Sequence, residues 1–274
     1  MTQIALTIAG VDPSGGAGVL ADVKTFFAFG VFPTAAIASI TFQNTQGVFG
    51  AEHQSAATVR EQIIPILDDY DISAVKTGML PTRAVIDEVA LIIGQRGLRN
   101  IVVDPVVRST SGFDLIDSEA LKVLIEKLFP LSDLITPNIP EAERISGVAI
   151  ESRQDIRDAA LIMQGMGAKN VLITGGHFGN AERGMRNAES GVNGRMALDY
   201  LFLGDEEFVL EAEYFETSAT HGTGCTLASA ITANLALGND LAKSVSIAKR
   251  FVNEAIRTAP MIGRGHSPIN IKPI

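Results

Sequence analysis

The sequence is poor in the features that direct a chain to oxidising compartments or to polyanionic partners. It contains one cysteine in 274 residues, which excludes an internal disulfide and makes a reducing cytoplasm the expected location. Basic residues are not in excess: 22 lysines and arginines against 31 aspartates and glutamates give a net charge of −9. That balance argues against nucleic acid and acidic membrane surfaces as partners. An anionic ligand would therefore need a local pocket.

Long uninterrupted hydrophobic runs are also missing. Residues 26–42 carry no charge, but Gly30 and Pro33 interrupt them, and the end of a helix followed by a buried strand explains this pattern. The first ten residues lack a basic segment, so we expect no signal peptide. With 46% hydrophobic and 19% charged residues, the composition predicts a soluble globular protein without a membrane partner.

Short apolar segments alternate with helical patterns along most of the chain. Strands are predicted at residues 4–10, 34–44, 73–78, 100–106, 132–138 and 169–176. Helices are predicted at residues 18–30, 56–70, 81–95, 117–129, 152–167, 224–238 and 241–259. Apolar strands separated by helices indicate an α/β fold, in which helices cover both faces of a mainly parallel sheet.

The pattern changes after residue 180. Residues 180–195 are polar and rich in turn formers, which predicts a mobile loop, and 196–215 resemble a hairpin that would form an antiparallel edge. Neither an internal repeat nor a linker interrupts the chain, so we expect one domain over 1–274. Ligands of open parallel sheets bind beyond the carboxyl ends of the strands, where "TIAG", "TFQN", "VDPV", "TPN" and "TGG" fall.

The first glycine loop, "GGAGVLA" at 15–21, matches the spacing of the dinucleotide-binding fingerprint. Two features oppose a nicotinamide site: the loop is lengthened by "PSG", and no acid follows at the position that would grip a ribose. The chain also lacks a P-loop motif. Asp12 and Asp22 bracket the loop with polar groups, which favours substrate binding over a turn without a ligand.

The second glycine loop, "HGTGC", precedes a predicted helix and contains the lone cysteine. Gly222, Thr223 and Gly224 would leave the first N–H groups of the helix open to an anion, as phosphoryl transfer requires. Cys225 would point into this anion hole, and the helix start would lower the pKa of its thiol enough for a thiolate at neutral pH. The alternative is that Cys225 is simply a small buried residue.

Three polar residues fall at neighbouring strand ends. Asp104 precedes Pro105, and Asn138 is followed three residues later by Glu141 at a helix start. Carboxylates in such positions hold Mg²⁺ against nucleotide phosphates, although Asn138 and Glu141 also form the pattern of a helix-capping box. No two of the four histidines have metal-ligand spacing, and His221 beside the glycine loop is a candidate for a supporting role.

Seven blocks in register cover most of the chain: "LTIAGVDPSGGAGVLADVKTF", "TFQNTQGV", "VKTGML", "VVDPV", "LITPNIPEAE", "ITGGH" and "HGTGCT". In these the sequence resembles the hydroxymethylpyrimidine kinase/phosphomethylpyrimidine kinase family of thiamine biosynthesis, within the ribokinase superfamily. The resemblance implies a ribokinase-like fold, a homodimer, and MgATP-dependent phosphorylation first of hydroxymethylpyrimidine and then of its monophosphate. Residues 179–215 are the main part that it does not cover.

The resemblance also implies site residues. Gln43 would bind the pyrimidine edge, because its amide both donates and accepts. Gly10, Asp22, Met79 and Val106 would complete the substrate site.

For the nucleotide and metal, the resemblance assigns Asp104 and Glu141 to Mg²⁺ and Asn138 to the phosphates, with the anion hole as above. Cys225 would act either as a base or as a phosphate ligand. If it acts as a base, replacing it should slow the first transfer more than the second. The sequence departs from the common family pattern at Arg108 and Thr174, where many members carry lysine near the ATP phosphates. Arg108 would supply the missing charge through a bidentate phosphate contact.

Three other functions compete with this interpretation. Pyridoxal kinases of the same superfamily share the Gly-x-Gly-Cys loop, and Gln43 is what favours an aminopyrimidine instead. A nicotinamide oxidoreductase would rest on the first glycine loop alone. A non-catalytic nucleotide-binding regulator would follow if Arg108 and Thr174 marked a degraded site, but Asp104, Glu141 and the "HGTGC" loop are intact.

Overall fold

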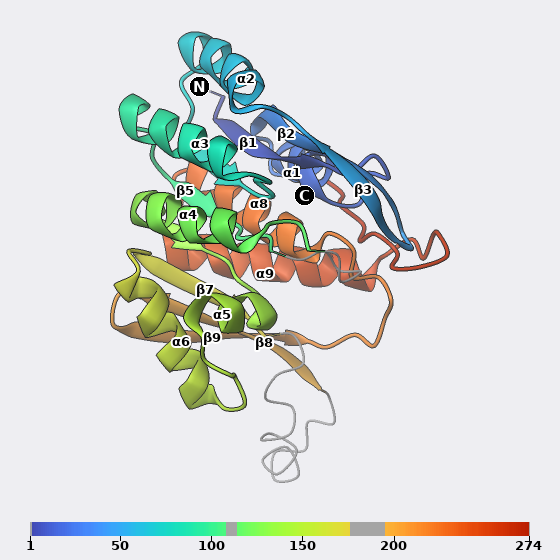
Figure 1. Cartoon of the computed structure of the whole chain (residues 1–274). Coiled ribbons are helices and arrows are strands. Elements are labelled where there is room, and N and C mark those ends of the chain that lie inside the picture. Colours follow the sequence, from blue (N-terminus) through green and yellow to red (C-terminus); the bar gives the residue numbers. More distant parts are fainter. Residues whose placement is uncertain (1, 108–113, 176–194, 274) are drawn as a thin grey trace.

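A nine-stranded sheet forms the centre of the molecule in the computed structural model, which describes residues 2–107, 114–175 and 195–273 (Figure 1). The strand order is β3-β2-β1-β4-β5-β6-β7-β8-β9. The strands are β1 (Ile4–Val11), β2 (Phe32–Asn44), β3 (Gly47–His53), β4 (Ala74–Thr77), β5 (Ile101–Val103), β6 (Leu134–Ile135), β7 (Asn170–Thr174), β8 (Met196–Leu203) and β9 (Glu206–Glu213). The loop predicted at 180–195, apart from its last residue, and Arg108 lie outside the described residues.

The middle of the sheet is parallel and both of its edges are antiparallel. Strands β2, β1, β4, β5, β6 and β7 pair in parallel, as the alternating pattern predicted. The hairpin β8–β9 forms the predicted antiparallel edge. At the opposite edge, β3 pairs antiparallel with β2, and this strand was not predicted because its side chains are only partly buried and show no apolar pattern.

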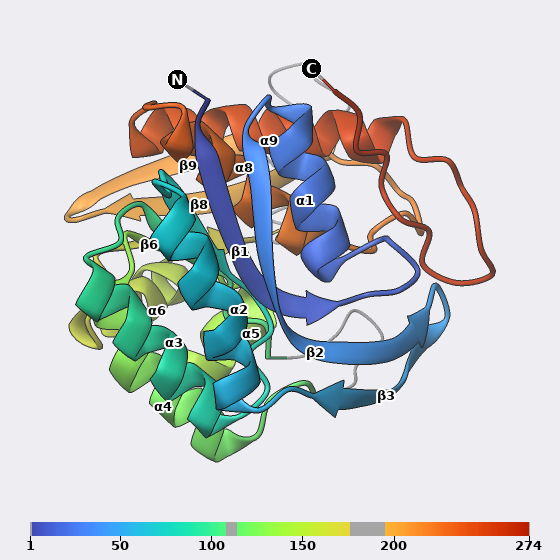
Figure 2. The same cartoon turned by 90° about the horizontal axis from the view of Figure 1, so that it is seen from above.

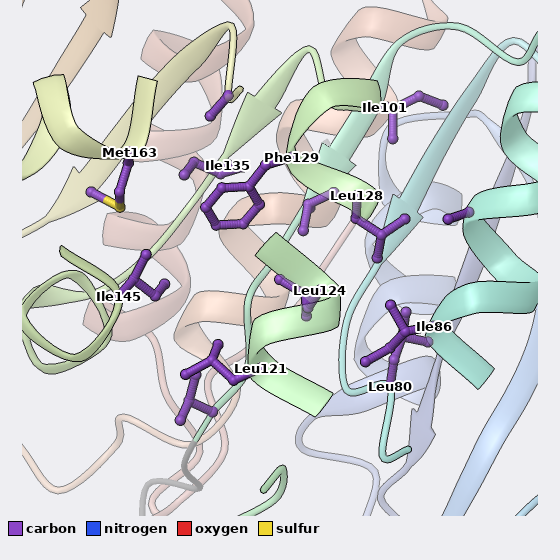
Figure 3. Packing of buried hydrophobic residues seen from close by; sticks show 14 of the residues in the cluster. Leu80, Ile86, Ile101, Leu121, Leu124, Leu128, Phe129, Ile135, Ile145 and Met163 are labelled. Carbon is purple, nitrogen blue, oxygen red and sulfur yellow. The ribbon is translucent and has the colours of Figure 1, made fainter. Parts of the chain in front are cut away.

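Helices cover both faces of the sheet, as Figures 1 and 2 show. One layer contains α2 (Ala56–Asp69), α3 (Arg83–Arg96), α4 (Ser118–Leu128), the 3₁₀ turn η1 (Phe129–Leu131), α5 (Ile139–Ser146) and α6 (Arg153–Gly165). The other contains α1 (Gly18–Ala28), α8 (Thr223–Ala236) and α9 (Leu241–Arg257). Within the first layer, Phe129 is fully buried near Leu124, Leu128 and Ile135 (Figure 3). None of the described helices is long and apolar enough to cross a membrane.

Two central strands are shorter than predicted. The sequence predicts strands at 100–106 and 132–138, whereas β5 has three residues and β6 has two. Pro105 and Pro137 follow these strands closely, and proline has no N–H to donate to a ladder. The early ends leave Asp104, Thr136 and Asn138 beyond the sheet, at its carboxyl edge.

The helix starts divide into two kinds. Six described helices have a side-chain cap at the N-terminus, from Ser55, Thr82, Asp117, Asn138, Ser152 and Asp240. Helices α1 and α8 instead begin after Ala17 and Gly222, which supply no capping hydrogen bond. Their first N–H groups therefore have no side-chain acceptor at the cap.

Candidate active site

A cavity of about 680 Å³ lies at the carboxyl edge of the parallel strands, where α1 and α8 begin. Twelve of the fourteen predicted site residues line it: Gly10, Gln43, Met79, Asp104, Val106, Asn138, Glu141, Thr174, Gly222, Thr223, Gly224 and Cys225. Asp22 does not line it, and Arg108 lies outside the described residues. The strand-end argument therefore located the cavity.

The start of α8 has the backbone geometry of an anion hole. Gly222 has φ +82°, and a side-chain carbon there would overlap the carbonyl oxygen of Gly16. Thr226 N–H donates to the Gly222 carbonyl at 2.9 Å, and Thr223 N–H donates weakly to Thr220 at 3.4 Å. The N–H groups of Gly224 and Cys225 have no acceptor within the helix because they precede its first bonded turn. They remain available to an anion in the cavity.

The prediction of a thiolate at Cys225 is wrong. Burial raises the pKa of the Cys225 thiol to about 12; Lys76 opposes this rise, and the carboxylates of Asp104 and Asp22 add to it. The prediction considered the helix start but not the two acids behind it. The thiol is protonated at neutral pH and donates a weak hydrogen bond to the Asp104 carboxylate, while the Gly18 N–H donates to its sulfur.

Two buried carboxylates face the same part of the cavity. Burial raises the pKa of Asp104 to about 6, with Lys76 opposing the rise and Asp22 adding to it. Burial and the nearby Asp104 raise the pKa of Glu141 to about 8. Each carboxylate disfavours ionisation of the other, and a cation near both would relieve this.

The donor set fits a magnesium ion. Asp104 Oδ2 is buried and has no hydrogen-bond partner. Glu141 accepts from Asn138 N–H at 3.0 Å and Val107 N–H at 3.2 Å, one on each oxygen, which leaves lone pairs for a water. Among the described residues no group of three or more His, Cys, Asp or Glu side chains could hold a metal, so water and phosphate would supply the remaining ligands.

The alternative explanation for Asn138 and Glu141, a capping box, is confirmed. Asn138 Oδ1 accepts from Glu141 N–H at 2.9 Å, and the Glu141 side chain accepts from Asn138 N–H. Thr174 N–H donates to Pro137 at 2.9 Å, which brings the end of β7 against this helix start. Capping and cation binding are compatible, because the cap fixes the direction in which Glu141 points.

Asp22 was predicted to bind substrate, but the structure places it behind the cavity. It is fully buried and accepts from Thr7 Oγ1 at 2.6 Å, Ser229 Oγ at 2.7 Å and Lys76 Nζ at 3.0 and 3.1 Å. All of its contacts are with the protein interior, so it holds Lys76. Lys76 Nζ also lies 3.9 Å from Asp104 Oδ2.

Lys76 is a site residue that the sequence analysis missed. Its side chain is fully buried, with 0% exposed to solvent, and it lines the cavity together with Asp104. Burial alone would lower the pKa of Lys76, but Asp22, Cys225 and Asp104 together outweigh burial and raise this pKa above its ordinary value. The available signal was a single charge inside the apolar strand "AVKT", which requires a buried partner.

Another part of the cavity lining has the composition of a ring-binding pocket. Gln43 Nε2 donates to Thr41 Oγ1 at 2.7 Å, which fixes the direction of the amide. Met79 packs over Gly10, where a side-chain carbon would lie 3.0 Å from the methionine sulfur. Val106 and Val48 add apolar surface, and Val48 belongs to the unpredicted strand β3.

A sheet of this order between two helix layers, with the cavity at the carboxyl ends of its strands, is a ribokinase-like α/β fold. The sequence profile described as phosphomethylpyrimidine kinase matches residues 12–270. The chain is also 41% identical over 266 residues to the hydroxymethylpyrimidine/phosphomethylpyrimidine kinase of Haemophilus influenzae, covering 97% of this chain and 95% of that protein. The chain belongs to the phosphomethylpyrimidine kinase family.

Two solved structures show the same fold. The phosphomethylpyrimidine kinase of Clostridium difficile is 38% identical, with a TM-score of 0.77 over 93% of this chain and 100% of that one. An ADP complex of Bacillus subtilis pyridoxal kinase is 34% identical, with a TM-score of 0.85 over 98% of this chain and 97% of that one. Both the pyrimidine and the pyridoxal kinases are therefore structural relatives.

Proposed function

We propose that the protein is a MgATP-dependent kinase that phosphorylates hydroxymethylpyrimidine and then its monophosphate, in thiamine biosynthesis. The observation that carries this proposal is a single cavity in which an anion hole at the start of α8 faces a pocket containing Gln43. Its volume of about 680 Å³ is in the usual range for small-molecule sites. Family membership supports the same substrates.

In this proposal the chain mainly binds and orients the reactants. The Gln43 amide, fixed by Thr41, pairs with a ring nitrogen and the amino group of the pyrimidine, while Met79 and Val106 contact the ring. Gly10 lets Met79 approach the floor of this pocket. The hydroxymethyl group is thereby directed toward the N–H groups at the start of α8, which positions it for transfer.

ATP would occupy the part of the cavity near Thr174 and Asn138, with its terminal phosphate at Gly222, Thr223 and Gly224. Acids outnumber cations on the described walls, which carry Asp12, Asp104, Glu141 and Glu143 against Lys76 and Arg144. A triphosphate entering such a site needs a divalent cation, and Asp104 and Glu141 would hold Mg²⁺ directly or through water. The ion supplies charge neutralisation to the phosphates. The role of Arg108 as a further phosphate contact stays a prediction.

The raised pKa of Cys225 changes its proposed role. A protonated thiol cannot take the hydroxyl proton, so Cys225 would instead donate to a phosphoryl oxygen beside the N–H groups. A strong base is not needed, because phosphoryl transfer proceeds mainly through a loose transition state. The same residue would then serve both transfers, and the basis for a larger effect on the first transfer is removed.

Pyridoxal phosphorylation is the second candidate, and the likeness to Bacillus subtilis pyridoxal kinase favours it. The test supplies ATP with hydroxymethylpyrimidine, with its monophosphate, or with pyridoxal, and follows each product by mass spectrometry. We expect the pyrophosphate from the monophosphate, since a simple vitamin kinase stops after one transfer. Turnover of pyridoxal alone would replace the proposal, and no turnover of any of the three would refute it.

Two further properties follow from the family resemblance and belong to the proposal, namely a homodimer and a cytoplasmic location. Light scattering after size-exclusion chromatography measures the first, and fractionation of cells measures the second. A monomeric mass at all concentrations would contradict the proposed dimer.

A further inference from the structure

Two buried residues far apart in the sequence, Asp12 and His221, form a close pair in the lining of the cavity. Asp12 is 1% exposed and His221 is 8% exposed, and His221 Nε2 lies 2.7 Å from Asp12 Oδ2. An ionised carboxylate can only accept, so Nε2 carries the hydrogen and donates it to Asp12. The pair joins the loop after β1 to the loop before α8.

Asp12 organises the first of these loops. Its Oδ1 accepts from the N–H of Ser14 at 2.8 Å and from its hydroxyl at 2.7 Å. Its Oδ2 accepts from Gly16 N–H at 3.1 Å and Ala17 N–H at 2.9 Å, in addition to His221. One carboxylate therefore fixes the loop that leads into the uncapped start of α1.

His221 stands directly before the anion hole and is held from its other side as well. The backbone N–H of His221 donates to the carbonyl oxygen of Ser267 at 3.3 Å, and a β-bridge pairs His221 with Pro268. A side-chain carbon on Gly16 would overlap the imidazole, and one on Gly222 would overlap the Gly16 carbonyl. The two glycine loops are thus packed against each other with no space left between their backbones.

We propose that His221, held by Asp12, is a positioning residue for phosphoryl transfer. Gly222 follows His221 directly, so the orientation of the imidazole fixes where α8 begins and where the N–H groups of Gly224 and Cys225 point. These groups are useful only if they meet the transferred phosphoryl group at hydrogen-bond distance. This inference rests on the proposed function, because it concerns the same anion hole.

Because His221 Nε2 donates to Asp12, a general base at this position would have to use Nδ1. Rescue by a glutamine, whose amide cannot take a proton, separates positioning from that role. Asp12 also accepts from four further donors, all on the loop after β1. The pair therefore transmits position between two loops.

Three variants separate positioning from simple stability. His221→Ala removes the link, whereas His221→Gln replaces Nε2 with an amide N–H that reaches Asp12 at a similar distance. Ile63→Ala, in the buried core of α2 far along the chain from either loop, is the control for lost stability alone. All three are compared with the wild type by thermal melting before kinetics are measured.

With the monophosphate as substrate, we expect His221→Ala to lower kcat by about 10- to 100-fold, because misplacement by about 1 Å costs up to 10²-fold. KM for the pyrimidine should change by less than about 3-fold, since the proposed ring contacts are Gln43, Met79 and Val106 and not His221. His221→Gln should restore kcat to within about 5-fold of wild type, and Ile63→Ala should lower the melting temperature without changing kcat. Wild-type kcat in His221→Ala, or no rescue by His221→Gln, would overturn the inference.

A second measurement keeps the inference separate from the substrate assignment. The non-hydrolysable analogue AMP-PCP with Mg²⁺ should raise the melting temperature of the wild type and of His221→Gln more than that of His221→Ala. This readout needs no pyrimidine. Absent pyrimidine turnover in the wild type would refute the proposed function, whereas equal AMP-PCP protection in wild type and His221→Ala would refute the role of His221.

Discussion

Replacing Lys76 with methionine tests the buried charge pair behind the cavity. Methionine has nearly the length and volume of lysine but no charge, so the change leaves the Asp22 carboxylate without its cationic partner. Both residues are 0% exposed, and Lys76 Nζ lies 3.0 and 3.1 Å from the two Asp22 oxygens. The remaining donors to Asp22, from Thr7 and Ser229, are neutral hydroxyls.

The expected cost is large because the charge that remains cannot reach water. Breaking a buried ion pair by removing one partner typically costs about 3–5 kcal/mol. For a chain of this size that corresponds to a fall in Tm on the order of 10 °C. The pKa of Lys76 is higher in the folded state than in the unfolded state. Its contribution to stability is therefore fully present below the unfolded-state pKa and is lost only as the pH rises through the folded-state pKa. Lys76 also opposes the rise in the pKa of Asp104, so in Lys76→Met that carboxyl group stays protonated to a higher pH. The loss in Lys76→Met should therefore be smaller at pH 6 than at pH 9.

The assay is urea unfolding of wild type, Lys76→Met, and the double variant Asp22→Asn with Lys76→Met. The double variant removes both charges and should recover at least half of the loss, because an uncharged pair leaves no isolated ion in the core. Arg83→Met breaks an exposed ion pair with Glu119 and serves as the control, with no expected change in midpoint. An unchanged midpoint in Lys76→Met, or a double variant less stable than the single one, would refute the reasoning.

Four other changes have defined outcomes. Gly222→Ala should lower kcat by about 10²-fold, since the new methyl group overlaps Gly16 and shifts the start of α8; activity within 3-fold of wild type would contradict this. Cys225→Ser keeps a donor, so the two transfers should change by the same factor to within about 3-fold, and a loss confined to the first transfer would restore the base. With a pKa of about 12, Cys225 should react with iodoacetamide about tenfold faster per pH unit from pH 7 to 10, because the thiolate fraction keeps rising; a plateau below pH 9 would show a lower pKa. Gln43→Leu should raise KM for hydroxymethylpyrimidine by about 10- to 100-fold with a smaller effect on kcat, measured by coupled ADP release.

The sequence was sufficient to locate the cavity because the relevant signals are local. Parallel strands bring their carboxyl ends to one edge, so residues such as Asp104 and Asn138 could be placed together without knowing any contact. The same argument fails for β3, whose pairing with β2 depends on a ribbon of half-exposed side chains without periodicity. It also fails for electrostatics, as Cys225 shows: its pKa is set mainly by burial, and then by Lys76, Asp104 and Asp22, which lie elsewhere in the sequence.

Asp22 and Lys76 show why closeness to a sequence motif does not place a residue in the binding site. Asp22 stands six residues after Gly16, in the first turns of α1, and its proximity in sequence to the glycine loop made it a candidate substrate ligand. In the fold its side chain is hydrogen-bonded to Ser229 of α8 and Lys76 of β4, a strand in the middle of the sheet. No sequence pattern states which of two acids beside a loop faces the ligand, because that choice is made by a lysine 54 residues away.

Gly16 and Gly222 are required for the same reason, which is visible only when the two loops are seen together in the fold. Each can be explained separately as a residue that keeps the backbone open to a ligand, and the second glycine loop was interpreted in that way from the sequence. In the fold Gly16 lies against His221, and Gly222 against the Gly16 carbonyl, so the first requirement on both positions is the close approach of two backbones. Because the two loops are packed tightly at this contact, the backbone of the anion hole is held in one position. The loops can therefore hold the N–H groups at the start of α8 in place without a side-chain cap, and a phosphate would be the acceptor that completes them. At the start of α1 the N–H groups of Gly16 and Ala17 already donate to Asp12.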